Sequence, residues 1–470
     1  MSRAKTLIRY GGFVFSVGSA RVIGIVLSSL TFPYLVRRLG VDLYGLWSYV
    51  VACCAFFTNI ANPGLNAYVA QQVAARRKEA LEMIPDVLVL RTIATAIAIV
   101  LLLGFTVFDR RADVRYLLRF YGVGALLVGL TNADHLLSAL EMFHVRSLLA
   151  VLQQALYAIG IFLLVRSPKE IVWLPISILA SALLTNLPGW FFLYQQGLRL
   201  QHLQPGRWKR ILVPSGHYAM STLMSNLYHR TGHLLVRWFL GEHALGLYAA
   251  AVRFLEIIEQ FFALVLSVFM PRIAIAAKSD AEVGRLARMA VTVTAVVNIP
   301  VMAGVLSTTH LAVPWVLGTQ FLEDVHLLRW MSPHLLMAPA SSLLAGTILY
   351  ALGRHRAYFA STAIGALAGL VSYIVLIPTL GLTGAALAFV CGQFFVAAAA
   401  YALLSRNLHG LLKNPYIAMA VTASVLMVAV VRIVNSYTSR PVLVFAAGAL
   451  VYVLLCAWPV KRWLLRELGV

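Results

Sequence analysis

The chain has 470 residues, of which 61% are hydrophobic and 12% charged, and its mean hydropathy is +0.85. So few charged side chains cannot cover a water-soluble globule of this length, which excludes an ordinary soluble enzyme and predicts an all-α integral membrane protein. The net charge of +21 would also suit a nucleic-acid-binding protein. The lysines and arginines lie in short segments between apolar runs, however, where membrane topology places them, so we expect no nucleic-acid partner.

Apolar runs long enough to cross a membrane follow one another along the whole chain. A helix needs about 20 apolar residues to cross about 30 Å of hydrocarbon. The first run lacks a small-residue cleavage pattern, so we interpret it as a retained span and not as a signal peptide. The expected fourteen spans are 12–36, 43–65, 84–106, 116–138, 146–165, 171–194, 211–239, 244–270, 287–309, 327–352, 357–378, 382–404, 415–434 and 441–459.

The positive charges indicate the orientation of these spans. Loops on the side of the N-terminus hold about twice as many lysines and arginines as loops on the other side, and cytoplasmic loops are the ones enriched in both. We therefore expect both termini in the cytoplasm. Five arginines fall inside spans, at Arg21, Arg91, Arg230, Arg253 and Arg329.

One pattern occurs twice. Leu39–Trp47 and Leu240–Tyr248 both read Leu-Gly, four residues including an acid, Gly-Leu and an aromatic residue. This repeat predicts two parallel six-helix halves related by an axis along the membrane normal, as in transporters that alternate access to a central site. Each repeated segment joins two spans, and its glycines are expected to permit a tight helical hairpin. The expected parts are a first half at 1–194, a linker at 195–210, a second half at 211–404 and two additional helices with a tail at 405–470.

The seventh span carries the richest set of polar side chains. They recur at helical spacing and fall on one face, and such a stripe cannot face lipid. It lines either a water-filled cavity or a tight helix interface, and its positive charge favours the cavity. Its members are Thr222, Asn226, His229, Arg230, His233 and Arg237.

Arg21 lies in the first span, which the repeat pairs with the seventh. Arg21 and Arg230 would then share one cavity, and guanidinium groups suit a phosphate because they bind its oxygens bidentately. The alternative for Arg21 is that its side chain extends to the cytoplasmic interface.

Two further spans carry candidate residues. On the eighth, Arg253 and Glu256 form either an ion-paired cluster or, with Glu259, a site at which a carboxylate takes up a coupling proton or sodium ion. On the second, Asn59 and Asn62 share a face beside Pro63-Gly64, which marks either a cavity lining or a helix end. Weaker candidates, most of them expected to form hydrogen bonds between helices, are Asn132, Asp134 and His135 on the fourth span, Gln153 and Gln154 on the fifth and Asn298 on the ninth.

No catalytic motif stands out, so we predict a protein that is not an enzyme and has no cofactor. His229 and His233 are spaced to hold a metal, but no third ligand is evident, and we predict none. The cysteines, Cys53, Cys54, Cys391 and Cys456, all lie in apolar runs and are expected to be buried.

Several short segments resemble one known family. Phe32–Gly40, Tyr44–Ser48 and Asn62–Ala70 look like the first two spans of polysaccharide flippases of the multidrug/oligosaccharidyl-lipid/polysaccharide (MOP) exporter superfamily. Gly246–Tyr248, Met270–Arg272, Leu352–Arg354 and Leu380–Ala388 are similar to that family's second half. Many members have twelve spans, and the last two spans here depart from that pattern.

The resemblance implies a MOP/MATE-like fold and a Wzx-type flippase of the bacterial inner membrane. Such proteins move undecaprenyl-pyrophosphate-linked O-antigen or exopolysaccharide repeat units from the cytoplasmic to the periplasmic leaflet by alternating access. Its partners would be the lipid-linked glycan, membrane lipids, a polysaccharide polymerase with its chain-length machinery, and a coupling proton or sodium ion.

Two other classes of function remain open. A lipid II flippase or a multidrug antiporter of the same superfamily would share the fold and the repeat. An integral-membrane glycosyltransferase, polymerase or ligase should have a sizeable external loop, and the longest one here, at about 108–115, is small.

Overall fold

The computed structural model describes residues 3–75, 77–195, 203–277, 279–404, 411, 414–438 and 440–468. All regular elements in these ranges are helical, and ten helices are long and apolar enough to cross a membrane. Part of the expected linker, 196–202, and much of the segment that follows 404, at 405–410 and 412–413, lie outside the described residues.

The chain divides into two compact units, Met1–Arg230 and Thr231–Val470. The boundary falls within helix α8 (Trp208–Ser267). The first unit contains α1 to α7 and the start of α8. Their bounds are α1 Arg3–Ala61, α2 Leu65–Ala75, α3 Arg77–Thr106, α4 Ala112–Leu130, α5 Asp134–Ala139, α6 Phe143–Leu164, η1 Pro168–Glu170, α7 Trp173–Gln195 and η2 Pro205–Arg207.

The repeated Leu-Gly pattern forms a sharp reversal in both places. Gly40 in α1 has φ 76° and ψ 176°, and Gly241 in α8 has φ 89° and ψ −174°. Glycine is the residue that adopts this region without strain. The rings of Phe32 and Tyr44 lie 6.1 Å apart, whereas a continuous helix would separate them by about 18 Å at about 1.5 Å per residue. The prediction of tight hairpins at these glycines is therefore confirmed.

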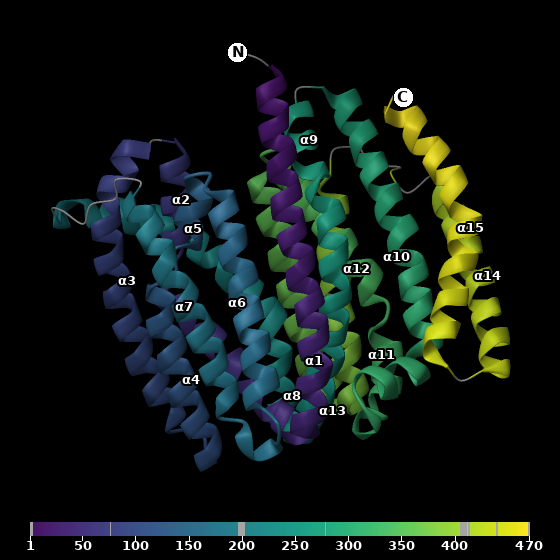
Figure 1. The fold of residues 1–470 in the computed structure, drawn as a ribbon, viewed down its shortest axis with the longest axis horizontal. Coiled ribbons are helices and arrows are strands. Elements are labelled where there is room, and N and C mark those ends of the chain that lie inside the picture. Colours follow the sequence, from purple (N-terminus) through teal and green to yellow (C-terminus); the bar gives the residue numbers. More distant parts are fainter. Residues whose placement is uncertain are drawn as a thin grey trace. The chain divides into compact units, whose positions relative to one another are not determined.

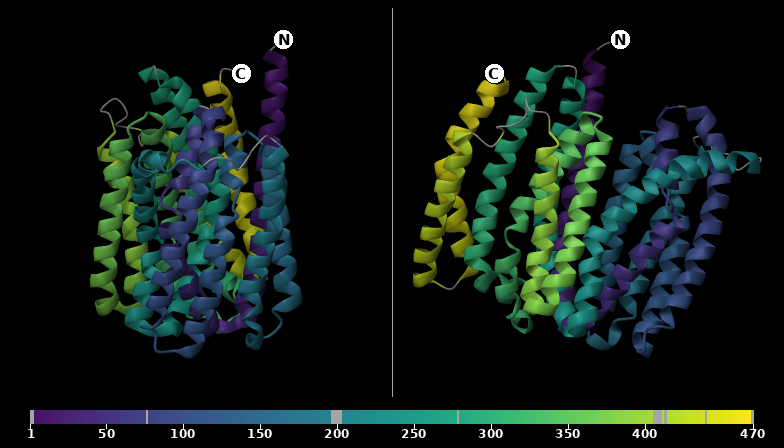
Figure 2. Two further views of the ribbon diagram at one scale, coloured as in Figure 1. Left: turned by 90° about the vertical axis from the view of Figure 1, so that its left-hand side faces the viewer. Right: turned by 180° about the vertical axis from the view of Figure 1, so that it is seen from behind.

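A third helix folds back in the same way. In α13 (His355–Ala402) the reversal lies at Gly381, with φ 60° and ψ −134°, and the two arms run side by side (Figure 2, right). Three of the membrane-spanning candidates therefore each consist of two arms joined by such a reversal. They are Gly18–Ala61, His229–Ala276 and His355–Ala402. With these three counted twice, the ten candidates in the described residues give thirteen spans; the expected span 327–352 is not among them, and the count of fourteen stays a prediction.

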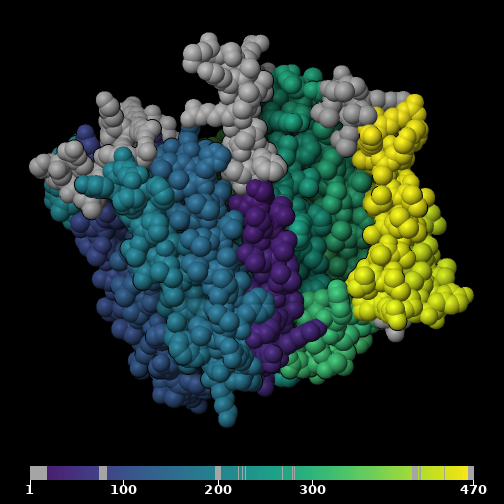
Figure 3. Space-filling model, in the orientation of Figure 1, coloured from purple at the N-terminus to yellow at the C-terminus, as the bar shows by residue number. Residues whose placement is uncertain are grey.

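Helices of the first unit pack around α1. This helix lies against α6 and also contacts α3 and α4, and α6 in turn packs on α7 (Figures 1 and 3). The start of α8 is held by a buried carboxylate, because Asp86 on α3 accepts hydrogen bonds from the Gln204 backbone N–H at 2.9 Å and from the Trp208 indole at 3.1 Å.

The second unit contains the remainder of α8 and the helices after it. Its other elements are α9 Phe269–Ala276, α10 Asp280–Val316, η3 Thr319–Phe321, α11 Asp324–Met331, α12 His334–Ser341, the π-helix η4 Ser342–Leu349, α13, α14 Pro415–Tyr437 and α15 Pro441–Leu468. Helices α14 and α15 pack on each other, and α14 packs on α10 (Figure 1).

The segment expected as one span at 327–352 is broken. Helix α11 ends at Met331, and α12 begins after Pro333 and continues as the π-helix η4. Proline cannot donate a backbone hydrogen bond, and π-helical turns are frequent at functional sites. Ser332 and Pro333, between α11 and α12, keep right-handed helical backbone angles, so the segment is interrupted without an extended stretch.

Candidate functional site

The polar stripe of the seventh span lies on α8 and becomes more buried towards the C-terminal end. Thr222 and His229 are exposed, whereas Asn226 and Arg230 are half-buried, all in the first unit. In the second unit His233 is buried with 5% exposure. Arg237 ends the stripe in an ion pair with Glu242 at 3.1 Å. Arg237 is thus engaged by a carboxylate, and the role of the other residues of the stripe in binding a substrate stays a prediction.

Arg230 is half-buried on α8. Its guanidinium can supply hydrogen-bond donors to a phosphate group. In the same unit, the Tyr121 ring of α4 packs edge-on against Trp47 of α1 at 4.9 Å. Arg21 lies on α1 with an exposed side chain, and its place in a shared cavity stays a prediction.

Asn62, at the end of the second span, lines a cavity of about 180 Å³, and Asn59 is not among its lining residues. The amide nitrogen of Asn59 is buried without a hydrogen-bond partner among the described residues. The sequence had left open a cavity lining or a helix end. Helix α1 ends at Ala61, Asn62 alone of the two lines the cavity, and a role of either in substrate binding stays a prediction. The other polar residues that line this cavity are Thr58, Asn66, Arg91, Thr95 and Asn132.

The acidic residues of the eighth span have different partners in the second unit. Arg253 and Glu256 form an ion pair at 3.1 Å. The Glu259 carboxylate lies 3.4 Å from the Nε2 atom of His334, the first residue of α12. Glu256 and Glu259 also line a cavity of about 300 Å³ that reaches Ser342 of the π-helix. Arg253 and Glu256 therefore form the ion pair that the sequence offered as one alternative. Glu259 instead lies next to the imidazole of His334.

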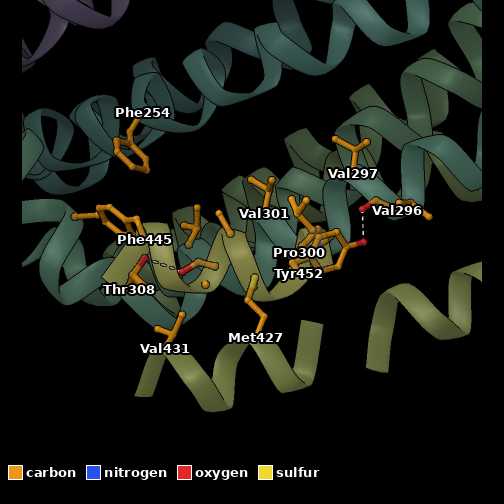
Figure 4. A pocket seen from close by; sticks show the side chains of 16 residues that line it. Phe254, Val296, Val297, Pro300, Val301, Thr308, Met427, Val431, Phe445 and Tyr452 are labelled. Carbon is orange, nitrogen blue, oxygen red and sulfur yellow. Dashed lines mark hydrogen bonds between the residues drawn. The ribbon is translucent and has the colours of Figure 1, made fainter. Parts of the chain in front are cut away.

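An apolar groove runs between α8, α10, α14 and α15 in the second unit, with a volume of about 490 Å³ (Figure 4). Phe254, Val301, Met427 and Phe445 point into it. The hydroxyl of Tyr452, a polar group at the groove, donates to the Val296 carbonyl at 2.6 Å. With its polar atoms bonded internally, the groove suits a hydrocarbon chain.

Comparison with known proteins identifies the family. Residues 13–276 match the family described as polysaccharide biosynthesis protein. The chain belongs to this family. None of the curated proteins matches its sequence.

Solved structures similar to this polysaccharide biosynthesis protein share its fold. The structure described as lipid II flippase MurJ in an inward closed conformation superposes with a TM-score of 0.78 at 15% identity, covering 97% of this chain and 99% of that one. An inward-facing multidrug resistance MATE family transporter superposes with a TM-score of 0.64 at 16% identity, covering 85% of this chain and 99% of that one. A MOP superfamily transporter from Pyrococcus furiosus superposes with a TM-score of 0.61 at 14% identity, covering 86% of this chain and 96% of that one. The chain is a multi-pass membrane protein with the MOP superfamily fold, as its sequence predicted.

All residues that the sequence singled out as a site lie within the region that matches the polysaccharide biosynthesis family. Sequence reasoning missed functional candidates outside that region. His334 is 2% exposed and stacks on Phe389 at 3.9 Å, and the Ser341 hydroxyl bonds to Gln393. The Pro-His pair inside an apolar run was the available signal for His334. The sequence showed Arg91 as an arginine inside a span, but it did not show which residues lie beside it in the fold.

Proposed function

We propose that this polysaccharide biosynthesis protein is a flippase. It moves undecaprenyl-pyrophosphate-linked oligosaccharide repeat units from the cytoplasmic to the periplasmic leaflet by alternating access, for the synthesis of a surface polysaccharide. The observation that carries the proposal is the family match over residues 13–276, which spans both the cationic part of α8 and the hairpin at Gly40. The proposed location is the bacterial inner membrane, with both termini in the cytoplasm.

The two units offer the two kinds of surface that such a substrate needs. In the first, Arg230, Asn226 and His229 project from one helix and supply donors to a pyrophosphate or sugar, with Arg21, Asn59 and Asn62 as further contacts. In the second, His233 belongs to the same set, and the apolar groove beside α14 and α15 fits part of a polyprenyl chain. Binding the head group by charge and the tail by apolar contact would draw on separate residues.

Transport is proposed to be coupled to an ion at Glu259, with Arg253 and Glu256 setting the charge nearby. Glu259 has 26% side-chain exposure and borders the cavity next to the π-helix, so a proton or sodium ion can reach it. A polymerase and its chain-length machinery are the proposed partners that use the translocated repeat unit.

A deletion strain tests this function. We expect loss of the surface polysaccharide and accumulation of the lipid-linked repeat unit, which added glycan-cleaving enzyme reaches in lysed but not in intact spheroplasts. The intact chain should restore export, Arg230→Gln should not, and Arg354→Gln should, because Arg354 donates to the Leu403 carbonyl at a helix end and is not among the proposed site residues. Export that continues without the chain would refute the proposal.

Lipid II is the second candidate substrate, favoured by the 97% coverage of this chain in the superposition on the lipid II flippase. The same deletion strain decides between them. Accumulated lipid II with a normal surface polysaccharide would select lipid II, and changed drug resistance alone would select multidrug export. Surface polysaccharide of altered chain length with normal translocation would favour a polymerase or ligase.

A further inference from the structure

The cavity beside Arg91 in the first unit is rich in hydrogen-bond donors. Its walls come from the end of α1, the start of α2, the middle of α3 and the end of α4, and its lining contains no carboxylate. Thr58 and Asn132 are exposed, so the cavity opens to the surface of the unit. A ligand can therefore enter without separating the helices.

Arg91 is the principal charge in this cavity. Its side chain is only 3% exposed, and one terminal nitrogen donates to the Gly129 carbonyl at the end of α4. That bond uses the negative end of a helix dipole, which offsets about half a charge. The Nε atom of Arg91 has no partner among the described residues. A buried guanidinium with an unused donor costs free energy unless an anion completes it.

Two amide groups add donors to Arg91. The Asn62 oxygen accepts from the Asn66 backbone N–H at 3.2 Å, and the Asn132 oxygen accepts from the Asp134 backbone N–H at 2.9 Å. Because both oxygens are engaged, the amide nitrogens remain as the groups that can serve a ligand. The local turns thus fix the orientation of each amide.

Asn66 contributes a hydrogen-bond acceptor, which needs a donor from the ligand. Its side-chain oxygen is buried without a partner in the described part of the chain, and an acceptor of this kind needs a donor such as a hydroxyl. An inorganic anion satisfies the donors better than it satisfies Asn66. A ligand that carries a carboxylate beside a hydroxyl satisfies both.

The size of the cavity limits the ligand. Its volume of about 180 Å³ is smaller than the roughly 300 to 1,000 Å³ of pockets for drug-sized ligands. One sugar ring with its substituents fits, and an oligosaccharide does not.

We propose that the cavity lined by Asn62, Asn66, Arg91 and Asn132 binds the carboxylate and an adjacent hydroxyl of one acidic sugar. The inference rests on the proposed function, because the sugar would be part of the lipid-linked glycan. Arg91 and the two amide nitrogens hold the carboxylate, and the Asn66 oxygen accepts from the hydroxyl. The substrate class is thereby narrowed to repeat units that contain a uronic acid or a similar hydroxy acid.

Equilibrium binding of radiolabelled glucuronate to the full-length chain in nanodiscs tests this site. We expect saturable binding in which unlabelled glucuronate competes, whereas glucose and phosphate compete at least about tenfold more weakly, as expected when one charge-assisted contact or the hydroxyl contact is lost. Phosphate or glucose that competes as well as glucuronate would overturn the proposal.

Variants decide whether Arg91 and the amides form the site. Arg91→Gln should weaken glucuronate binding by about tenfold or more, and Arg91→Lys should retain part of it. Arg354→Gln is the matched control, since it removes another arginine that bonds a helix-end carbonyl and should change nothing. If Arg91→Gln does not fold, Asn132→Ala provides the test, because its side chain is exposed at a turn. Unchanged binding in Asn132→Ala and Arg91→Gln would overturn the site.

The result is separable from that of the proposed function. Glucuronate binding in nanodiscs requires no transport, so a chain that exports repeat units but does not bind glucuronate refutes only the acidic-sugar site. A chain that binds glucuronate while its deletion leaves export normal refutes only the flippase.

Discussion

Glu259 and His334 bring a carboxylate and an imidazole together at the break in a membrane-spanning segment. The two side chains differ in exposure, 26% against 2%, and lie 3.4 Å apart. Arg253 and Glu256 neutralise each other nearby at 3.1 Å, so a proton gained or lost at Glu259 changes the net charge of the cluster. Under the proposed coupling, that change would alter the relative free energies of the conformations that open the cavity to either side of the membrane.

Glu259→Gln separates coupling from transport. In proteoliposomes with an imposed proton or sodium gradient, we expect the stimulation of flipping by the gradient to fall roughly tenfold, within the usual range of coupling free energies. Flipping without a gradient should persist. Glu282→Gln is the control, because Glu282 is a carboxylate 3.9 Å from Arg285 that does not line this cavity, and it should keep the stimulation. Equal stimulation in Glu259→Gln and the unaltered chain would contradict the role of Glu259.

Glu170 gives a prediction in the loop between α6 and α7. Its carboxylate accepts from the backbone N–H groups of Arg166 and Ser167 at 2.6 and 2.9 Å, and these bonds lower the pKa of Glu170 from its ordinary 4.5. A lowered folded-state pKa contributes stability above pH 4.5, and this contribution disappears as the pH falls through the folded-state value. Glu170→Gln should therefore lower the melting temperature slightly at pH 7 and have a smaller effect in acid. An effect that grows towards low pH would contradict this sign.

At the level of elements, the hairpins depend on single glycines. The backbone at Gly40 has φ 76° and ψ 176°, a region that costs a residue with a Cβ atom about 1–3 kcal/mol. Gly40→Ala should destabilise the detergent-solubilised chain by about that amount, measured by thermal unfolding. Gly24→Ala, on the same helix, is the control, because a methyl group there meets no atom within 4 Å and alanine favours the helix. Equal melting temperatures for both variants would show that Gly40 tolerates a side chain.

The apolar groove can be tested with two neighbouring residues on α15. Val453 lines the groove and is 54% exposed, whereas Leu454 is 70% exposed and does not line it. Val453→Trp should fill the groove and lower flipping of polyprenyl-linked substrate by about tenfold, because apolar contact with the tail is lost. Leu454→Trp adds the same ring outside the groove and should have little effect. A similar loss of flipping in both variants would show that the added tryptophan ring acts without regard to the groove.

The sequence predicted local features of these elements better than it predicted contacts between distant segments. The Leu-Gly repeat predicted the reversals at Gly40 and Gly241, because a backbone with positive φ favours glycine at that one position, which can be recognised in the sequence. The break at Pro333 lay inside a run apolar enough to indicate one span. The polar face of α8 was evident from its spacing, but the pairing of Arg237 with Glu242 depends on the reversal at Gly241. The sequence did not predict the cavity at Arg91, because Asn62 and Asn66 lie far from Asn132 in the sequence and meet it only through the packing of the helices.

Across the whole molecule, the last two helices decide whether the groove is complete. Helices α14 and α15 supply Met427, Phe445 and Tyr452 to its lining, and many polysaccharide flippases have only twelve spans. The groove can hold part of the polyprenyl chain as proposed only if both helices cross the membrane. The short segment that joins them, around Thr438, must then lie on the side opposite both ends of the pair.

Reporter fusions test this topology. A periplasm-dependent reporter fused after Thr438 should be active, and the same reporter fused at Asn414 or after the C-terminus should be inactive, since both ends are expected in the cytoplasm with the positive charges. A fusion after Ser167, between α6 and α7, is the control for an external loop and should be active. Inactive reporter at Thr438 with an active control would mean that α14 and α15 do not cross. The polyprenyl tail would then need another path, although the head-group residues on α8 would keep their proposed role.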